Sequence, residues 1–568
     1  MSGQSASPLP LSVADAAALR SAHPARPSAS LVVVRPAAVG LEVLLLRRAE
    51  KGDRNSGAWV FPGGLVDPAD HVPEIPVAGL DDAQASNRLG VAGGGLAYWV
   101  AAVRECFEEA ALLFAVDAAG VDIAWRAEDE ARVNAWRDRL RQGTSGMAAL
   151  CRQAGWRLAL DRLVYLSHWI TPLGLPKRFD TRFFIAEAPR NQSARHDAAE
   201  IVEHRWLRPA DALSSGLRLL TPTAKTLETL ARFDTADGAV EWARAQRDVP
   251  AIRSRLGNGR DGLRPVLPDE PAWAEIGRLD PFGRGDARYE IRPGVAVRLS
   301  ARVIRVTAGN PGVMTGPGTN SYLVGGGPAN DWAVIDPGPH DAAHVDHLLA
   351  AAPGPVRWIL VTHTHADHSP AVAMLKARTG AMVLGRLADH PEWQDAGFAP
   401  DRQLAGGERI GIDAGTTLRV VHTPGHASNH LCYLLEEEKT LFTGDHVMQR
   451  STVVINPPDG DMAAYLTSLG RLMEEELEWL APGHGFLMAQ PREALAAIVR
   501  HRMQRETKVI DALRDLGPAA PIEALLTQVY DDVPGHLHAM ATRSLKAHLI
   551  KLRDEGVATD RAGRWSLA

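Results

Sequence analysis

Seven side chains in the second half of the sequence have the types and spacing expected of metal ligands. Four of them lie within six residues, in His363-Thr364-His365-Ala366-Asp367-His368. The other three follow further along the chain: His426, Asp445 and His484. Imidazole nitrogens and carboxylate oxygens suit zinc, and a zinc site with an open position lowers the pKa of a bound water to about 7. Seven ligands suit two ions, so the pattern predicts a dinuclear zinc hydrolase.

Apolar runs that predict buried strands precede these ligands: Trp358–Val361 before His363, Leu418–Val421 before His426 and Lys439–Phe442 before Asp445. Loops at the carboxyl ends of such strands are where α/β folds place their sites. After His368, Ser369-Pro370 offers a helix N-cap and a first-turn proline, and Gly380 offers a helix stop. The first ligand cluster is therefore predicted to occupy a strand-to-helix turn.

The order of these ligands resembles that of the metallo-β-lactamase superfamily. The resemblance implies an αββα sandwich with two zinc ions. One ion would be held by His363, His365 and His426, and the second by Asp367, His368 and His484. Asp445 would bridge the ions, and Asp367 would also orient the attacking hydroxide. Three nearby histidines are expected to stay outside the coordination sphere: His422, His430 and His446.

A narrower resemblance lies in the segments 315–322 and 451–462, which are similar to the subfamily that includes the β-lactamase-like endoribonuclease of mitochondria. That subfamily carries a small C-terminal winged helix. Helices predicted around Val509–Leu516, Ile522–Tyr530 and Met540–Glu555, with a hairpin turning near Ala562-Gly563, match it. Residues 501–568 hold ten Lys and Arg against nine Asp and Glu, which is little support for RNA binding. The winged domain is equally compatible with a lid or a dimer module.

A second group of carboxylates stands on a helix predicted from about Leu96. Glu105 lies three and four positions before Glu108 and Glu109, so the three share one helix face. A divalent cation relieves the repulsion between them, and oxygen ligands with a diphosphate substrate suit magnesium or manganese. The alternative is an ordinary solvated acidic face on which Arg104 pairs with Glu108.

Together with Trp59–Asp67 upstream, this helix resembles the Nudix hydrolase box. The resemblance implies an α/β/α sandwich that cleaves diphosphates, with Glu105, Glu108 and Glu109 as metal ligands, one of which helps to activate water. Asp70 stands where the family has a glutamate, Ala111 replaces a glycine, and about 26 residues are inserted between the two halves of the box. A similar insertion occurs in a Nudix subgroup similar to the peroxisomal coenzyme A diphosphatases.

The segments 168–172 and 178–184 are similar to the same subgroup. Arg178 and Arg182 in the second of them are predicted to bind substrate phosphates, because guanidinium matches phosphate oxygens in a bidentate way. Glu200 or Glu203 would supply a further metal ligand, or would be a surface charge beside the strand that begins near Arg205.

The length of 568 residues predicts several domains of mixed α/β and α+β class. The expected order is a weakly ordered leader (1–28), a Nudix domain (29–233), an irregular connector (234–287), a metallo-β-lactamase domain (288–496) and a winged helix (497–568). The net charge of −6 predicts no overall attraction to nucleic acid or membranes. Three cysteines cannot form a disulfide framework, and no signal peptide or membrane span is evident, so a cytoplasmic protein is expected.

These patterns predict a bifunctional hydrolase with a thioester or a phosphodiester as substrate of the zinc site and a diphosphate as substrate of the Nudix site. Acyl coenzyme A contains both a thioester and a diphosphate. The alternative is a zinc-dependent endoribonuclease whose Nudix domain senses a nucleotide without cleaving it. The expected partners are therefore small molecules such as coenzyme A esters or nucleoside diphosphates, with RNA weakly supported, no membrane and a possible second copy of the chain.

Overall fold

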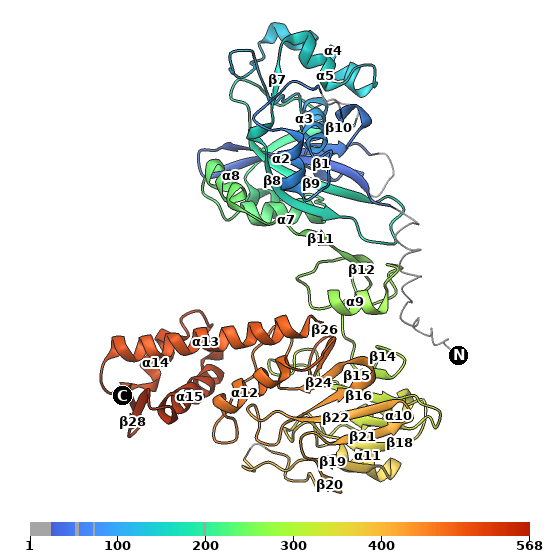
Figure 1. Ribbon diagram of the computed structural model, residues 1–568, viewed down its shortest axis with the longest axis vertical. Helices are drawn as coiled ribbons and strands as arrows, with labels where there is room; N and C mark the ends of the chain where they lie inside the picture. Colours follow the sequence, from blue (N-terminus) through green and yellow to red (C-terminus); the bar gives the residue numbers. More distant parts are fainter. Residues whose placement is uncertain (1–23, 51–55, 72–73, 197–199, 393) are drawn as a thin grey trace. The chain divides into compact units, whose positions relative to one another are not determined.

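The computed structural model describes residues 24–50, 56–71, 74–196, 200–392 and 394–568 (Figure 1). Most of the predicted leader, residues 1–23, lies outside the described part. The chain divides into two compact units. The first runs to Leu256 and includes Phe282–Arg284, and the second comprises Gly257–Pro281 and Gly285–Ala568.

The first unit is built on a mixed sheet of eight strands. In spatial order its main strands are β10 (Ile201–Leu207), β2 (Leu41–Arg48), β1 (Arg26–Pro36), β9 (Phe179–Glu187), β8 (Val164–Ile170) and β11 (Ala251–Arg253). Two short strands pair with inner strands of the sheet: β3 (Trp59–Val60) with β2 and β4 (Gly63–Leu65) with β1. Because β1 pairs in parallel with β9 and carries the apolar run Leu31–Val34, the centre of the sheet is buried.

Helices cover both faces of this sheet. Helix α3 (Leu96–Ala110) packs against β1 and β4, and its Trp99 and Phe107 enter the core. Helix α8 (Ala236–Ala245) packs against β8 and β9. The other helices are α2 (Asp82–Leu89), α4 (Glu130–Arg141), α5 (Met147–Ala154), α6 (Pro209–Ser214) and α7 (Thr221–Leu230). A small sheet joins β5 (Val77–Ala78), β7 (Arg157–Ala159) and β6 (Ala115–Val116).

The prediction of irregular structure across 234–287 is wrong. Helix α8, strand β11, the two-stranded sheet of β12 (Arg255–Gly257) and β13 (Arg264–Val266), and helix α9 (Trp273–Leu279) all lie in this segment. Thr235 caps α8 by accepting a hydrogen bond from the Gly238 amide, and Ala239 and Val240 bury its inner face. Arg, Gly and Pro signal turns in the sequence, but they do not show that the short runs between them are buried.

The second unit contains a sandwich of two sheets. The first has the order β14 (Ala296–Arg298), β15 (Val303–Thr307), β16 (Asn320–Gly325), β17 (Trp332–Ile335), β18 (Val356–Leu360), β19 (Met382–Gly385) and β20 (Arg402–Gln403). The second has the order β21 (Arg409–Asp413), β22 (Thr416–His422), β23 (Leu431–Leu435), β24 (Thr440–Gly444), β25 (Trp479–Pro482) and β26 (Met488–Ala489).

A hydrophobic core joins the facing sides of the sheets, and helices cover the outer sides. Tyr322, Leu360 and Phe442 are among the buried residues of the central core. Helices α10 (Ala342–Ala351) and α11 (Val372–Thr379) cover the first sheet, while α12 (Met462–Met473) and α13 (Pro491–Leu516) cover the second. This arrangement confirms the predicted αββα sandwich. Helix α11 begins three residues after the predicted cap at Ser369 and ends, as predicted, before Gly380.

The C-terminal region is a winged helix, as predicted. Helices α14 (Ile522–Val529) and α15 (His538–Asp554) pack with the end of α13 and with a sheet of β27 (Ala520–Pro521), β29 (Arg564–Leu567) and β28 (Ala558–Arg561). The hairpin turns at Ala562 and Gly563, which both have positive φ. The helix predicted from Val509 instead begins at Pro491 and runs for 26 residues from the sandwich into the winged helix (Figure 1). No helix in the described ranges is long and apolar enough to cross a membrane.

Candidate metal centre

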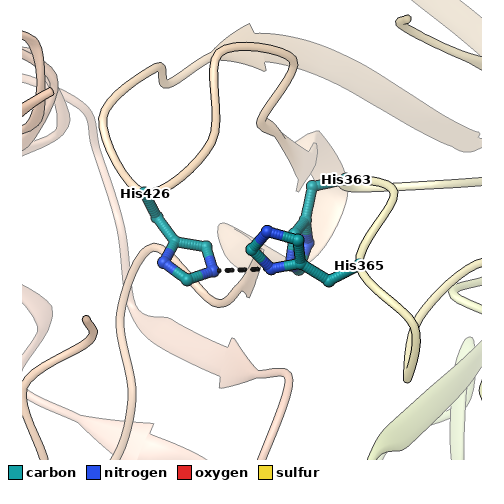
Figure 2. A group of neighbouring side chains, drawn as sticks. All are labelled: His363, His365 and His426. Atoms are coloured by element: carbon teal, nitrogen blue, oxygen red, sulfur yellow. Dashed lines mark hydrogen bonds between the residues drawn. The ribbon is translucent and has the colours of Figure 1, made fainter. Parts of the chain in front are cut away.

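Three histidines from two loops converge at the edge of the sandwich (Figure 2). Nδ1 of His365 lies 3.0 Å from Nε2 of His363 and 3.1 Å from Nε2 of His426. Strand β18 ends at Leu360, three residues before His363, and His426 follows β22. The three rings therefore present nitrogen atoms to one small volume.

A second group lies beside the first and contains the carboxylates. Nε2 of His368 lies 3.3 Å from Oδ2 of Asp367 and 3.4 Å from Oδ1 of Asp445. Nε2 of His484 lies 3.4 Å and 3.2 Å from the same two oxygens. Oδ2 of Asp445 lies 3.9 Å from Nε2 of His426. Asp445 thus reaches both groups, and the structure brings together all seven predicted ligands.

The residues fit a pair of divalent cations. Nε2 of His368, Nε2 of His484 and Oδ1 of Asp445 are buried and have no hydrogen-bond partner within the described residues. Buried polar atoms are normally paired, so three unpaired ligand atoms in one cluster fit cations between them. Imidazole nitrogen with carboxylate oxygen is a donor set that zinc favours.

The two groups differ in how they hold protons. Burial, reinforced by the neighbouring His426, lowers the pKa of His365 to about 3, so its ring is neutral and its lone pair is free for a metal. Burial also lowers the pKa of His484, but Asp445 and Asp367 outweigh it and raise that pKa to about 10. Metal binding at the second group therefore releases protons.

Hydrogen bonds to the far nitrogen fix the orientation of several rings. His426 donates from Nδ1 to the carbonyl of Val454 at 2.8 Å, and His484 donates from Nδ1 to the carbonyl of Gly318 at 3.2 Å. A carbonyl oxygen only accepts, so both rings carry their proton on Nδ1 and leave Nε2 for a metal.

Asp336 is a residue of the site that the sequence analysis missed. It is buried, and its carboxylate accepts hydrogen bonds from Nδ1 of His368 at 2.9 Å and from the amide and hydroxyl of Thr362 at 2.7 Å each. It directly follows β17, which is parallel to β18, so it lies at the strand edge that carries the ligands. The signal that was available is the Asp-Pro-Gly sequence after an apolar run.

We expect Asp336→Asn to lower zinc affinity about 10- to 100-fold, because the amide group presents N–H donors where the carboxylate accepts three hydrogen bonds. Competition with a chromophoric chelator measures the change. Asp346→Asn, an exposed substitution on α10, serves as the control. Wild-type affinity for both zinc equivalents in Asp336→Asn would contradict the expectation.

The three histidines predicted to lie outside the coordination sphere are not part of the ligand groups. His430 is buried with Nδ1 2.9 Å from the Thr423 hydroxyl, and its ring centroid lies 5.0 Å from that of His363. His446 is buried against the ring of Tyr465. His422 is half-buried, with Nε2 3.3 Å from the Ser428 carbonyl.

In the first unit, Arg104 organises the carboxylates of α3. It donates to both oxygens of the buried Asp70 at 2.9 Å and 3.0 Å, and to Glu105 and Glu108 at 2.9 Å and 3.2 Å. The pairing of Arg104 with Glu108 is therefore present. Asp70, the residue that departs from the family pattern, ties the loop before the insertion to the helix after it.

Glu109 and Glu105 face the glycine-rich strand β4. The Gly63 amide donates to Oε2 of Glu109 at 3.0 Å, and a Cβ on Gly64 would lie only 2.2 Å from Oε1 of Glu105. Burial raises the pKa of Glu105 to about 7 and that of Glu109 well above its ordinary value. These glutamates are less tightly gathered than the histidines: within the described ranges, every group of three close ligand atoms belongs to the histidine site.

We expect the magnesium affinity of this site to fall about fivefold between pH 7 and pH 6. Glu105, with its pKa raised to about 7, is protonated below that pH, so the cation must displace a proton in order to bind. Calorimetry with the zinc site already saturated measures the affinity at each pH. An affinity that stays constant from pH 8 to pH 6 would contradict the expectation.

The two predicted phosphate-binding arginines both have partners inside the protein. Arg178 donates to the carbonyls of Thr171 and Pro172 at 3.1 Å and 3.2 Å. Arg182 is buried, is paired with Asp180 and contacts His168. A role for either arginine in substrate binding stays a prediction.

Of the two further glutamates, Glu200 is close enough to Glu109 to raise its pKa. Glu203 is instead paired with Arg205 and Arg47 on β10 and β2. Glu200 is therefore the better placed of the two to join a metal site on α3.

Comparison with known proteins agrees with this geometry. The family model for the metallo-β-lactamase superfamily matches residues 314–484. The lactamase-like protein vrtG of Penicillium aethiopicum is 36% identical over 248 residues, which cover 43% of this chain and 75% of that protein. The chain belongs to the metallo-β-lactamase superfamily.

Two further relatives are similar to this chain. The atrochrysone carboxyl ACP thioesterase of Aspergillus chevalieri is 34% identical over 226 residues, covering 38% of this chain and 68% of its own length. The β-lactamase-like protein 2 homolog of Drosophila melanogaster is 30% identical over 272 residues, covering 46% of this chain and 90% of its own length.

Family models also match two other parts of the chain. The NUDT19 Nudix domain matches residues 76–218, and the β-lactamase-associated winged helix domain matches residues 522–565. The predicted family resemblances and the order of the domains are thus confirmed. The chain is a hydrolase that combines a divalent-metal-binding metallo-β-lactamase domain with a Nudix domain.

Proposed function

We propose that the metallo-β-lactamase domain hydrolyses thioesters with two zinc ions and that the Nudix domain hydrolyses a diphosphate with magnesium or manganese. Acyl coenzyme A contains both bonds, so one class of small molecule accounts for both sites. The observation that carries the proposal is a seven-ligand centre in a chain that is 34% identical, over 226 residues, to a protein named as an ACP thioesterase. Acyl carrier protein and coenzyme A present the acyl group on the same phosphopantetheine thiol.

When bound, the zinc ions would supply Lewis-acid activation of water and of the thioester carbonyl. They would be held by His363, His365 and His426 in one group, by Asp367, His368 and His484 in the other, and by Asp445 between the two. The protein contributes imidazoles and carboxylates at fixed positions. The Nδ1 atoms of three of the imidazoles are hydrogen-bonded away from the ligand cluster, to Asp336 from His368 and to backbone carbonyls from His426 and His484.

Asp367 is the residue that we assign to orient the attacking water. Its carboxylate stays ionised: although burial opposes this, His368 and its other neighbours lower the pKa of Asp367. The Thr319 hydroxyl donates to its Oδ2 at 3.0 Å and fixes the direction of the group. Water attacks the carbonyl carbon, and the carbon–sulfur bond breaks. The proton that the water gives up goes to the leaving sulfur, so the products are a thiol and a carboxylic acid.

In the Nudix site, Glu105, Glu108 and Glu109 would hold the divalent cation, and one of them accepts a proton from the water that attacks phosphorus. The phosphorus–oxygen bond of the diphosphate then breaks, giving two phosphomonoesters. The ion pairs of Arg104 with Asp70 and Glu105 fix the position of α3 relative to the loop before the insertion.

Thiol release from a panel of acyl coenzyme A esters, measured with a chromogenic disulfide reagent, tests the thioester proposal. Zinc-loaded protein should release one thiol for each acid formed, and chelator-treated protein should release none. A structured and an unstructured RNA are assayed in parallel. RNA cleavage without thiol release would reject the thioester proposal in favour of an endoribonuclease.

A further inference from the structure

A buried arginine on α13, Arg502, has no carboxylate partner among the residues that the structure describes. Arg502 is 2% exposed, and it forms no ion pair with an acidic residue in the described part of the chain. The nearby Glu506 is occupied, because it accepts hydrogen bonds from His548 at 3.2 Å and Lys551 at 2.8 Å. Burial of a guanidinium without a counter-charge is costly, so the contacts that Arg502 does make must matter.

One contact of Arg502 leads to a candidate metal ligand through the backbone. Its Nη2 donates to the carbonyl of Val453. The next residue, Val454, accepts the 2.8 Å hydrogen bond from Nδ1 of His426. Val453 is itself 2% exposed. The carbonyls of Val453 and Val454 therefore lie on a packed segment that the Arg502 guanidinium contacts.

The second contact leads to the same ligand by a different route. Cζ of Arg502 lies 5.5 Å from the centroid of the Tyr465 ring, a cation–π distance. Tyr465 packs so closely on the turn before His426 that a Cβ on Gly425 would lie 2.3 Å from its Cα. Both chain segments that hold His426 therefore rest on Arg502 or on its aromatic partner.

Tyr465 extends this arrangement to Asp445. Its hydroxyl donates to the carbonyl of His446 at 2.9 Å, and His446 directly follows Asp445. The Arg502–Tyr465 pair thus lies behind the loops of two candidate ligands, and neither residue contacts the ligand atoms themselves.

We propose that Arg502 is a positioning residue for the metal centre, and that it keeps the His426 ring in the orientation that ligation requires. The proposal rests on the proposed metal centre, but not on the identity of the substrate. Helix α13 also supplies Val509 and Leu513 to the winged-helix core. The winged helix and the sandwich thus share one continuous helix, α13, whose Arg502 contacts the segment that accepts the hydrogen bond of His426.

The test compares metal binding by wild-type protein and Arg502→Gln, each prepared free of metal. Zinc affinity is measured by chelator competition, and the visible absorption of the cobalt(II)-substituted protein reports ligand geometry. We expect Arg502→Gln to lose about tenfold in affinity for one metal equivalent, with a changed cobalt spectrum. Arg502→Lys, which keeps one donor for Val453, should lie between the two. Arg500→Gln, exposed on the same helix, is the matched control.

A second comparison uses His426→Ala as the background. If Arg502 acts through His426, adding Arg502→Gln to His426→Ala should change zinc affinity less than threefold. Wild-type affinity and spectrum in a folded Arg502→Gln, or an undiminished effect in the His426→Ala background, would overturn the proposal. If Arg502→Gln loses its cooperative thermal transition, Arg502→Lys decides: a drop of threefold or more supports the proposal, and wild-type affinity rejects it.

Failure of the metal-centre proposal looks different from failure of the positioning proposal. If wild-type protein takes up no zinc or cobalt, the metal centre itself is rejected. If wild-type protein binds two equivalents and the Arg502 variants bind them equally well, only the positioning role is rejected.

Discussion

Replacing Asp445 by alanine is expected to lower kcat/KM for thioester hydrolysis by at least about a thousandfold, or about 4 kcal/mol in transition-state stabilisation. Asp445 is the side chain that reaches both halves of the metal centre, with Oδ1 3.4 Å and 3.2 Å from His368 and His484 and Oδ2 3.9 Å from His426. Without it, two buried imidazoles lose the carboxylate they face. Thiol release measures the loss, and bound zinc is quantified in the same samples.

The control for this substitution is Asp346→Asn, which removes an exposed carboxylate on α10 and should leave thiol release unchanged. Diphosphate hydrolysis by Asp445→Ala should also stay at the wild-type rate, because the Nudix carboxylates lie in the other compact unit. Thiol release by Asp445→Ala within tenfold of wild type would remove Asp445 from the metal centre.

Glu109→Gln is expected to lower diphosphate hydrolysis by at least about a thousandfold while thiol release persists. The Glu109 carboxylate is buried, faces Gly63 and has a pKa well above its ordinary value, as expected of a group that needs a cation beside it. Glutamine keeps an acceptor for the Gly63 amide, so the fold should survive the change. Product formation from a coenzyme A ester measures the effect.

Glu241→Gln, exposed on α8, is the control for the Nudix substitution. Unchanged diphosphate hydrolysis by Glu109→Gln would reject the assignment of this residue. If wild-type protein itself cleaves no diphosphate but binds nucleotides, the Nudix domain is a sensing module rather than a second catalytic site.

Six of the seven ligand positions could be predicted from sequence because they follow strong strand signals. One apolar run precedes four of them: His363, His365, Asp367 and His368. Because a short turn after a buried strand stays at the edge of the sheet, their side chains are expected to lie close together there. The outer contacts could not be predicted in the same way. Asp336 carries a local signal, Asp-Pro-Gly after an apolar run, but its contact with His368 depends on the pairing of β17 with β18. Arg502 lies behind the centre through the packing of α13 on α12, which no local pattern encodes.

A departure from a family motif shows in the sequence which residue is replaced, but not what the new side chain contacts. Asp70 was identified as a substitute for a glutamate, yet its two hydrogen bonds to Arg104 span 34 residues and depend on how the insertion folds. The prediction of irregular structure across 234–287 failed because it was based on local turn signals alone. The turn residues of this segment are evident in the sequence. Its short apolar runs form a strand and a helix that are buried only because β11 pairs with β8 and α8 packs on the sheet.

We propose that two separate sites of this chain act on one class of substrate. This proposal is tested most directly by mass spectrometry of the products after one acyl coenzyme A ester is incubated with zinc, magnesium and either wild-type protein, Asp445→Ala or Glu109→Gln. Asp445→Ala should yield 3′,5′-ADP and acyl phosphopantetheine without a free thiol, Glu109→Gln should yield free coenzyme A, and wild type should yield both kinds of cleavage. If the wild-type protein breaks neither the thioester nor the diphosphate of any acyl coenzyme A ester, whatever its chain length, the proposal is contradicted.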